Sequence, residues 1–277
     1  MPATHLLGLL LNLAFLLLFF YYHDHGFDLT DEAFYALSAT QHENIIIGIS
    51  FGYLTSYLMS IFSCDFHDSR IIGYILLMAT TTLMVSSCLF KYTGKFSLSK
   101  LLTAVTISTP CIIFYSYGIY SLSYNNYSVF GINFILTGLF LNKNSKIFSF
   151  PSLFAGLGIF LLGMSKFTII PVFIFLVIVL YFFYKDKNDL KILLNGAIIS
   201  IFLLLLHFFI SNDSIELFIK RFMLIYENIS MLQSKHIEQF SLFYIISNFK
   251  EYILHLDKSL LIMYSICPVY LLICLKN

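Results

Sequence analysis

The stretch LLGLLLNLAFLLLFFYYHDHGFDLTDEAFYAL, residues 6–37, joins an apolar run directly to a cluster of carboxylates and histidines. A bilayer core of about 30 Å is crossed by about 20 residues of helix, so the apolar run is long enough for one span. No basic segment precedes it and no small-residue cleavage site follows it, so we expect a retained anchor rather than a signal peptide. The stretch thus predicts ionisable side chains at the lipid–water boundary.

The composition of the whole chain agrees with a membrane protein. Of its 277 residues, 59% are hydrophobic and 11% are charged, whereas soluble domains carry roughly 25% charged residues. The net charge of +1 gives no basic surface for a nucleic-acid partner. The five cysteines show no C-x-x-C spacing, so neither a zinc site nor a disulfide framework is indicated.

Apolar runs recur along the chain. They cover residues 5–22, 44–62, 71–90, 101–120, 127–142, 147–164, 167–184, 192–210 and 259–275. The run at 44–62 contains glycine, hydroxyl residues and tyrosine, which favours an interfacial or re-entrant helix over a span. The others predict an all-α, polytopic membrane protein with about eight transmembrane helices. We expect one integral membrane domain over 1–277, with an outer amphipathic segment at 211–258 and a final span at 259–275.

The basic residues give the expected orientation, since Lys and Arg in short loops prefer the cytoplasm. With the N-terminus inside and 44–62 not crossing, the following lysines fall inside: Lys91, Lys95, Lys100, Lys143, Lys146, Lys185, Lys187, Lys191 and Lys276. The short outer loops then hold only Arg70 and Lys166. If 44–62 did cross, the N-terminus would have to face out, and the acidic cluster would lie in the cytoplasm.

The sequence LTDEAFYAL, residues 29–37, predicts the start of a helix within the acidic cluster. Thr30 is a suitable N-cap, and Asp31 and Glu32 occupy the first turn, where negative charge is favourable. Capping alone is therefore one explanation for the two acids. The other is chemical, because a carboxylate beside the lipid headgroups can serve as acid or base for a lipid-borne substrate.

Four residues of this helix carry a resemblance. Asp31, Glu32, Tyr35 and Ala36 follow a first span in the form DExxYA, which resembles the first outer loop of the membrane glycosyltransferases of the GT-C fold. The likeness is greatest to protein O-mannosyltransferases and lipid A aminoarabinose transferases, although Phe34 stands where those proteins often have a basic residue. As a pattern of spans and loops it covers residues 5–210.

The resemblance implies a transferase that moves a sugar from a polyprenyl-phosphate donor to an acceptor hydroxyl, with inversion, at the outer face of a bacterial inner membrane. The acceptor would be a glycan, a lipid or a protein. Asp31 is the candidate catalytic base, since a hydroxyl needs a proton acceptor to become a good nucleophile. Glu32 is a candidate to orient the acceptor, to bind a divalent cation or to favour the helix dipole. A divalent cation is the one cofactor that the resemblance suggests.

Substrate contacts are expected from five further residues. Arg70 and Lys166 are candidates to bind the leaving phosphate, whose developing charge calls for a cation. Asn125 and Asn126, in SYNNYS, are candidates to hydrogen-bond the sugar, and Tyr35 follows the acidic pair on the same helix.

Other polar clusters have structural explanations. His23, Asp24, His25 and Asp28 suggest a metal, but their spacing fixes no third ligand, and solvated interfacial residues are the preferred interpretation. The segment CDFHDSR, residues 64–70, is interpreted as a helix cap with an Asp–Arg pair, and His207 as a packed, hydrogen-bonded residue.

Two other classes of function stay open. A flippase or transporter for lipid-linked glycans would place ionisable residues within its spans. A non-catalytic accessory subunit would keep the architecture without the chemistry.

Overall fold

The computed structural model describes residues 3–22, 31–41, 50–115, 121–141, 149–165, 187–211, 215–220 and 223. These residues form helices and short connections, and they include no β-strand, so the all-α prediction is confirmed for this part of the chain. The chain divides into two compact units, Met1–Phe218 and Ile219–Asn277. The helices described below belong to the first unit.

The helices lie where apolar runs or capping signals predict them. Their bounds are α1 Ala3–Tyr22, α2 Asp31–Thr40, α3 Phe51–Phe62, α4 Asp68–Thr93, α5 Leu98–Tyr115, α6 Tyr124–Phe140, α7 Phe150–Ser165 and α9 Lys187–Ile210. The predicted spans at 167–184 and 259–275 lie outside the described residues, as does most of the segment at 211–258.

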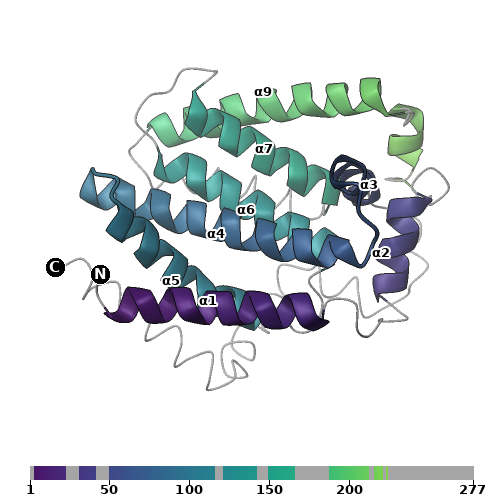
Figure 1. Ribbon diagram of the computed structural model, residues 1–277. Helices are drawn as coiled ribbons and strands as arrows, with labels where there is room; N and C mark the ends of the chain where they lie inside the picture. Colours follow the sequence, from purple (N-terminus) through teal and green to yellow (C-terminus); the bar gives the residue numbers. More distant parts are fainter. Residues whose placement is uncertain are drawn as a thin grey trace, which may run out of the picture. The chain divides into compact units, whose positions relative to one another are not determined.

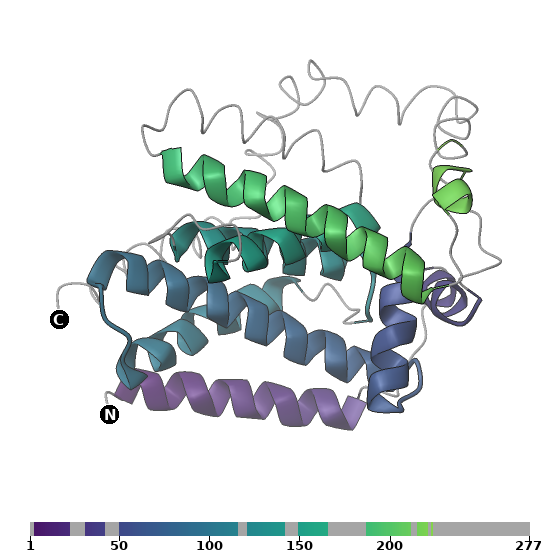
Figure 2. The ribbon, with the colours of Figure 1, turned by 90° about the horizontal axis from the view of Figure 1, so that it is seen from above.

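The long helices pack side by side in the order α1, α5, α4, α6, α7, α9 (Figure 1). The short helices α2 and α3 pack on each other and lie at one end of this array, which we call the α2 end (Figures 1 and 2). Helix α4 begins there, whereas α1 and α9 end there. Neighbouring helices joined by short connections run in opposite directions, as the span pattern predicts.

Two described helices are long and apolar enough to cross a membrane, namely α4 over Asp68–Thr93 and the Asn188–Ile210 part of α9. Helix α7 and the Gly8–Leu18 part of α1 are apolar but shorter. Helix α3 has 12 residues, which gives a length of about 18 Å, well below the roughly 30 Å core of a bilayer. The described part of the run at 44–62 therefore fits the interfacial interpretation.

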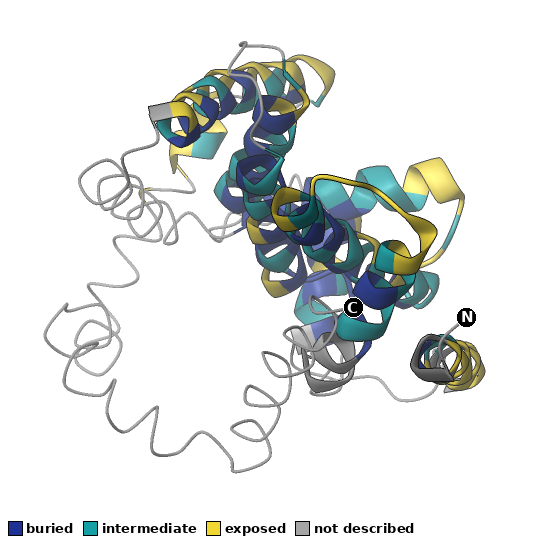
Figure 3. Ribbon diagram, turned by 90° about the vertical axis from the view of Figure 1, so that its left-hand side faces the viewer, coloured by how far each residue is buried: buried dark blue, intermediate teal, exposed yellow. Residues whose placement is uncertain are grey.

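Large apolar side chains are exposed along the two outermost helices. On α1, Leu17 is 61% exposed, and on α9 Phe202 is 64% and Phe209 88% exposed. Figure 3 shows the exposed face of α1 beside the N-terminus. Soluble monomers rarely expose continuous apolar surfaces of this kind. The two faces indicate association with a membrane.

Helices α6 and α7 approach each other closely through glycines. A Cβ atom on Gly158 would lie 2.4 Å from the carbonyl oxygen of Gly131, and one on Gly138 would lie 2.4 Å from that of Pro151. Small residues at such crossings allow two backbones to touch, which is how helices commonly associate in lipid. Gly158 on α7 and Gly138 on α6 are therefore required by packing.

Buried amides and hydroxyls add links between helices. The amide of Asn133 on α6 donates to the hydroxyl oxygens of Thr81, at 3.1 Å, and Thr80, at 3.3 Å, on α4. Asn12 on α1 donates to the hydroxyl of Thr109 on α5. Such bonds are worth about 0.6 kcal/mol each on average between helices in a membrane, and here they fix which faces meet.

Candidate functional site

The site residues meet at the α2 end. Helix α2 begins at Asp31, as the acidic first turn predicts. The side chain of Asp31 and the predicted N-cap Thr30 lie outside what the structure describes. The next residue, Glu32, has a side chain that is only 1% exposed, so its carboxylate is removed from water and needs partners within the protein.

Arg70, on the first turn of α4, is the main partner of Glu32. Its Nε lies 2.8 Å from Oε1 of Glu32, and its Nη2 lies 2.5 Å from Oε2. The guanidinium therefore binds both carboxylate oxygens at once, which is the strongest arrangement of this pair. Two residues that are 38 positions apart thus join α2 to α4. Removing one partner of a buried pair costs about 3–5 kcal/mol.

The connection before α6 completes the network. The hydroxyl of Ser121, itself fully buried, donates to Oε1 of Glu32. Asn126 on α6 donates from its amide to the carbonyl oxygen of Ser121 at 2.8 Å. Ser123 is the N-cap of α6 and accepts from the backbone N–H of Asn126. Asn126, predicted to bind sugar, is 2% exposed, and its amide helps to position Ser121.

An aromatic cluster supports the ion pair. The ring of Tyr35, 4% exposed, meets those of Phe51 and Tyr124 edge-on, each with centroids 5.8 Å apart. The hydroxyl of Tyr127 lies 3.1 Å from that of Thr55 on α3. Tyr35, predicted to contact substrate, is thus packed among rings from α3 and α6, where it positions α2.

Of the two remaining predicted substrate contacts, the structure describes Asn125. Asn125 lies on the first turn of α6 and is exposed. Lys166 lies outside the described residues, but Ser165, the residue before it, ends α7 and is fully buried. The hydroxyl of Ser165 lies 3.2 Å from that of Ser128 on α6. Ser128 follows Asn125 by one helical turn, so α7 ends close to the beginning of α6.

In the connection that leads into α4, the N-cap residue His67 makes no side-chain capping hydrogen bond, but Asp65 binds the first N–H of the helix. Oδ1 of Asp65 accepts from the backbone N–H of Asp68 at 2.9 Å. Beside it, burial raises the pKa of the Cys64 thiol, and the carboxylates of Asp68 and Asp65 raise it further. The thiol is therefore a poor nucleophile near neutral pH.

His207 is packed and hydrogen-bonded, as predicted. Its ring meets that of Tyr53 edge-on at 5.1 Å, and its Nδ1 lies 3.4 Å from the hydroxyl of Tyr57. Both tyrosines belong to α3, so this contact fixes α3 against the end of α9.

The histidine and acid cluster at 23–28 lies outside the described residues. Within the described residues, no group of three or more His, Cys, Asp or Glu side chains is arranged to hold a metal ion.

Of the two acids of the DE pair, the structure describes the side chain of Glu32. Glu32 already has Arg70 and Ser121 as partners, so it is suited to positioning the first turn of α2. Sequence reasoning missed Ser121 and the contact between Ser128 and Ser165. The capping pattern of Ser123 could have been found in the sequence, but an isolated serine such as Ser121 carries no signal of its partner.

Comparison with known proteins gives no match for this chain among family models, curated proteins or solved structures.

Proposed function

We propose that the protein is an integral membrane glycosyltransferase that moves a sugar from a polyprenyl-phosphate donor to an acceptor hydroxyl at the outer face of the membrane. The observation that carries the proposal is the buried network of Glu32, Arg70 and Ser121 at the α2 end. It joins three segments that are distant in the sequence and fixes the helix turn on which Asp31 stands.

Asp31 is the catalytic base in this proposal. Glu32 is bound by an arginine and a serine, so its negative charge is already stabilised and it is a weak base. Asp31, the first residue of α2, accepts the proton of the acceptor hydroxyl while that oxygen attacks the anomeric carbon. The bond from this carbon to the phosphate oxygen breaks, and the configuration inverts. General base catalysis of this kind contributes roughly 100- to 10,000-fold in rate.

The leaving phosphate is bound by Lys166 in this proposal. Arg70 is the other candidate, but Nε and Nη2 of its guanidinium bind the carboxylate of Glu32. The end of α7, one residue before Lys166, lies beside the first turns of α6 through Ser165 and Ser128. Asn125, on the first turn of α6, is exposed and is suited to contact the sugar.

The membrane arrangement has about eight spans. Support comes from the two helices of spanning length, from the exposed apolar faces of α1 and α9, and from the lysines of the described helices. Lys91 lies at the end of α4 that is remote from the α2 end, and Lys191 lies in the corresponding part of α9. Because cytoplasmic loops are rich in lysine, the α2 end faces the periplasm or exterior.

A transfer assay in proteoliposomes tests the function. The full chain is reconstituted with radiolabelled polyprenyl-phosphate hexoses and pentoses and with cell-envelope acceptors, and the released polyprenyl phosphate is separated by chromatography. A transferase releases polyprenyl phosphate and labels the acceptor. Movement of intact donor across the membrane without release would identify a flippase. The absence of both, over the whole donor panel, would favour an accessory subunit.

A further inference from the structure

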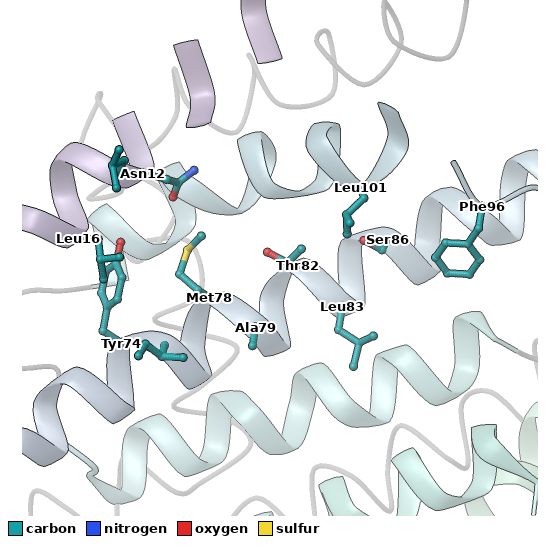
Figure 4. A pocket seen from close by; sticks show the side chains of 12 residues that line it. Asn12, Leu16, Tyr74, Met78, Ala79, Thr82, Leu83, Ser86, Phe96 and Leu101 are labelled. Atoms are coloured by element: carbon teal, nitrogen blue, oxygen red, sulfur yellow. The ribbon is translucent and has the colours of Figure 1, made fainter. Parts of the chain in front are cut away.

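A pocket of about 610 Å³ lies between α1 and α4 (Figure 4). Its wall on the α1 side includes Asn12 and Leu16, and its long wall runs along α4 from Tyr74 to Ser86. Helices α1 and α4 both pack on α5, and the pocket separates them from each other. We call it the α1–α4 pocket. Its size is in the range of small-molecule sites, roughly 300–1,000 Å³.

The length of the pocket matches a hydrocarbon chain from one leaflet. From Tyr74 to Ser86 the helix axis rises by about 18 Å, whereas half of a bilayer core is about 15 Å. The lining is mainly apolar, and Ile75 is 49% and Leu13 52% exposed. The pocket can therefore be entered from the lipid between α1 and α4.

One end of the pocket lies at the turn between α4 and α5. Phe96 in this turn and Leu101 on α5 belong to the lining, and both are exposed. Gly94 reverses the chain with a left-handed φ of 68°, which suits a residue without a Cβ. The ring of Phe96 stacks on that of Phe90 at 4.7 Å, so the turn holds its aromatic residue in place at the pocket entrance.

The same turn is strongly basic. The segment KYTGKFSLSKL, residues 91–101, contains three lysines and no acid. Lys95 directly precedes Phe96 in the turn, and Lys100 directly precedes Leu101 in the first turn of α5. The ammonium group of Lys100 donates to the carbonyl oxygen of Lys95 at 3.1 Å, so the two lysines lie close together. Each lysine at a membrane surface favours an anionic lipid by about 1 kcal/mol, or roughly fivefold.

A buried polar group lies just inside this entrance. Ser86 is 6% exposed and faces Leu101 across the pocket (Figure 4). Its Oγ has no hydrogen-bond partner among the described residues. Buried hydroxyls are almost always hydrogen-bonded, so a bound molecule with an acceptor at this depth would satisfy it. Leu101 is one helical turn into α5, and an ester carbonyl of a glycerolipid lies at about that depth below its phosphate.

We propose that the α1–α4 pocket binds one anionic glycerophospholipid from the leaflet on the lysine-rich side. One acyl chain fills the pocket along α4, an ester carbonyl accepts from the Ser86 hydroxyl, and the phosphate contacts Lys95 and Lys100. The entrance with Lys95 and Lys100 is at the opposite end of α4 from Arg70, and the proposal does not depend on the proposed transfer reaction. By filling the space between α1 and α4, the lipid stabilises the position of α1.

The test measures lipids retained by the purified full chain. The protein is extracted from membranes containing equal amounts of palmitoyl-oleoyl phosphatidylglycerol and phosphatidylcholine, and bound lipid is counted by native mass spectrometry. We expect about one phosphatidylglycerol per chain and little phosphatidylcholine. Ala79→Phe, at an exposed position of α4 in the pocket, should abolish retention, whereas Ile132→Phe, exposed on α6, should not.

The charge variants test the headgroup site. Lys95→Gln with Lys100→Gln should lower the preference for phosphatidylglycerol about 25-fold, whereas Lys191→Gln, an exposed lysine of α9, should leave it unchanged. A photoreactive phosphatidylglycerol should crosslink the wild-type protein at α1 and α4, which keeps the test independent of any folding defect in a variant. Equal retention of both lipids, crosslinks confined to α9, or displacement by undecaprenyl phosphate would overturn the proposal.

Discussion

The guanidinium of Arg70 binds both carboxylate oxygens of Glu32, and this buried pair connects the first turn of α4 with the first turn of α2. One acid of the DE pair is thereby a positioning residue. The hydroxyl of Ser121 binds the same carboxylate, so three segments depend on it. Loss of the Glu32 contacts is therefore expected to weaken the connection between these three segments.

Breaking the pair should destabilise the protein strongly. Arg70→Ala leaves the Glu32 carboxylate buried with one strong partner removed, which costs about 3–5 kcal/mol. The double variant Glu32→Leu with Arg70→Met should lose less than Arg70→Ala, because no unpaired charge remains. Thermal unfolding followed by circular dichroism in detergent measures this. Lys191→Gln, an exposed lysine of α9, is the control, and equal melting temperatures for Arg70→Ala and this control would show that the pair is unimportant.

Glycines of α7 should differ sharply in their tolerance of alanine. A Cβ on Gly158 would lie 2.4 Å from the backbone oxygen of Gly131, whereas a Cβ on Gly163 meets nothing within 4 Å. Gly158→Ala should therefore push α6 and α7 apart, at a cost of about 1–3 kcal/mol. Gly163→Ala is the matched control, with the same change in helix propensity. If both variants unfold at the same temperature, the close α6–α7 contact is wrong.

Cys64 should react slowly with thiol reagents. Burial raises its pKa above the ordinary value, and Asp68 and Asp65 add to this, so less thiolate is present at any pH near neutral. In a variant that keeps only Cys64, the rate of maleimide labelling should still increase with pH in the range where the labelling rate of glutathione no longer increases. Asp68→Asn should lower the pKa and speed up labelling at pH 8. A labelling rate equal to that of glutathione at every pH would show that the pKa of Cys64 is not raised.

The two ends of α4 should lie on opposite sides of the membrane. Single cysteines are placed at Thr40 and Ser97 in a background without native cysteines, and intact cells are treated with a membrane-impermeant maleimide. We expect labelling at Thr40→Cys only, because the proposed orientation places the lysine-rich turn around Ser97 in the cytoplasm. Labelling at Ser97→Cys alone would invert the orientation and place the α2 end in the cytosol.

The positions of the helices could be predicted from the sequence because each apolar run is bounded by charged or turn-forming residues. The start of α2 at Asp31 follows from its acidic first turn, and the end of α7 at Ser165 from the charge that follows it. These signals are local, so one sequence is sufficient to find them. The number of spans depends in part on residues outside the described ranges, and it stays a prediction.

The partners of the site residues could not be predicted in the same way. The local sequence offered Asp65 and Asp68 beside Arg70, yet the structure adds a bidentate pair with Glu32, 38 residues earlier. Tyr35 and Asn126 resembled substrate contacts, but they pack against α3 and the connection before α6. Which long-range partner a polar residue finds depends on how the helices cross, and single-sequence periodicity does not contain that information.

In the proposed reaction Asp31, and not Glu32, removes the proton of the acceptor hydroxyl. The most direct measurement is the rate of sugar transfer by Asp31→Asn in proteoliposomes, with the melting temperature recorded on the same sample. We predict a wild-type melting temperature and a rate at least about 100-fold lower. A normally folded Asp31→Asn protein that transfers sugar at the wild-type rate would contradict the account.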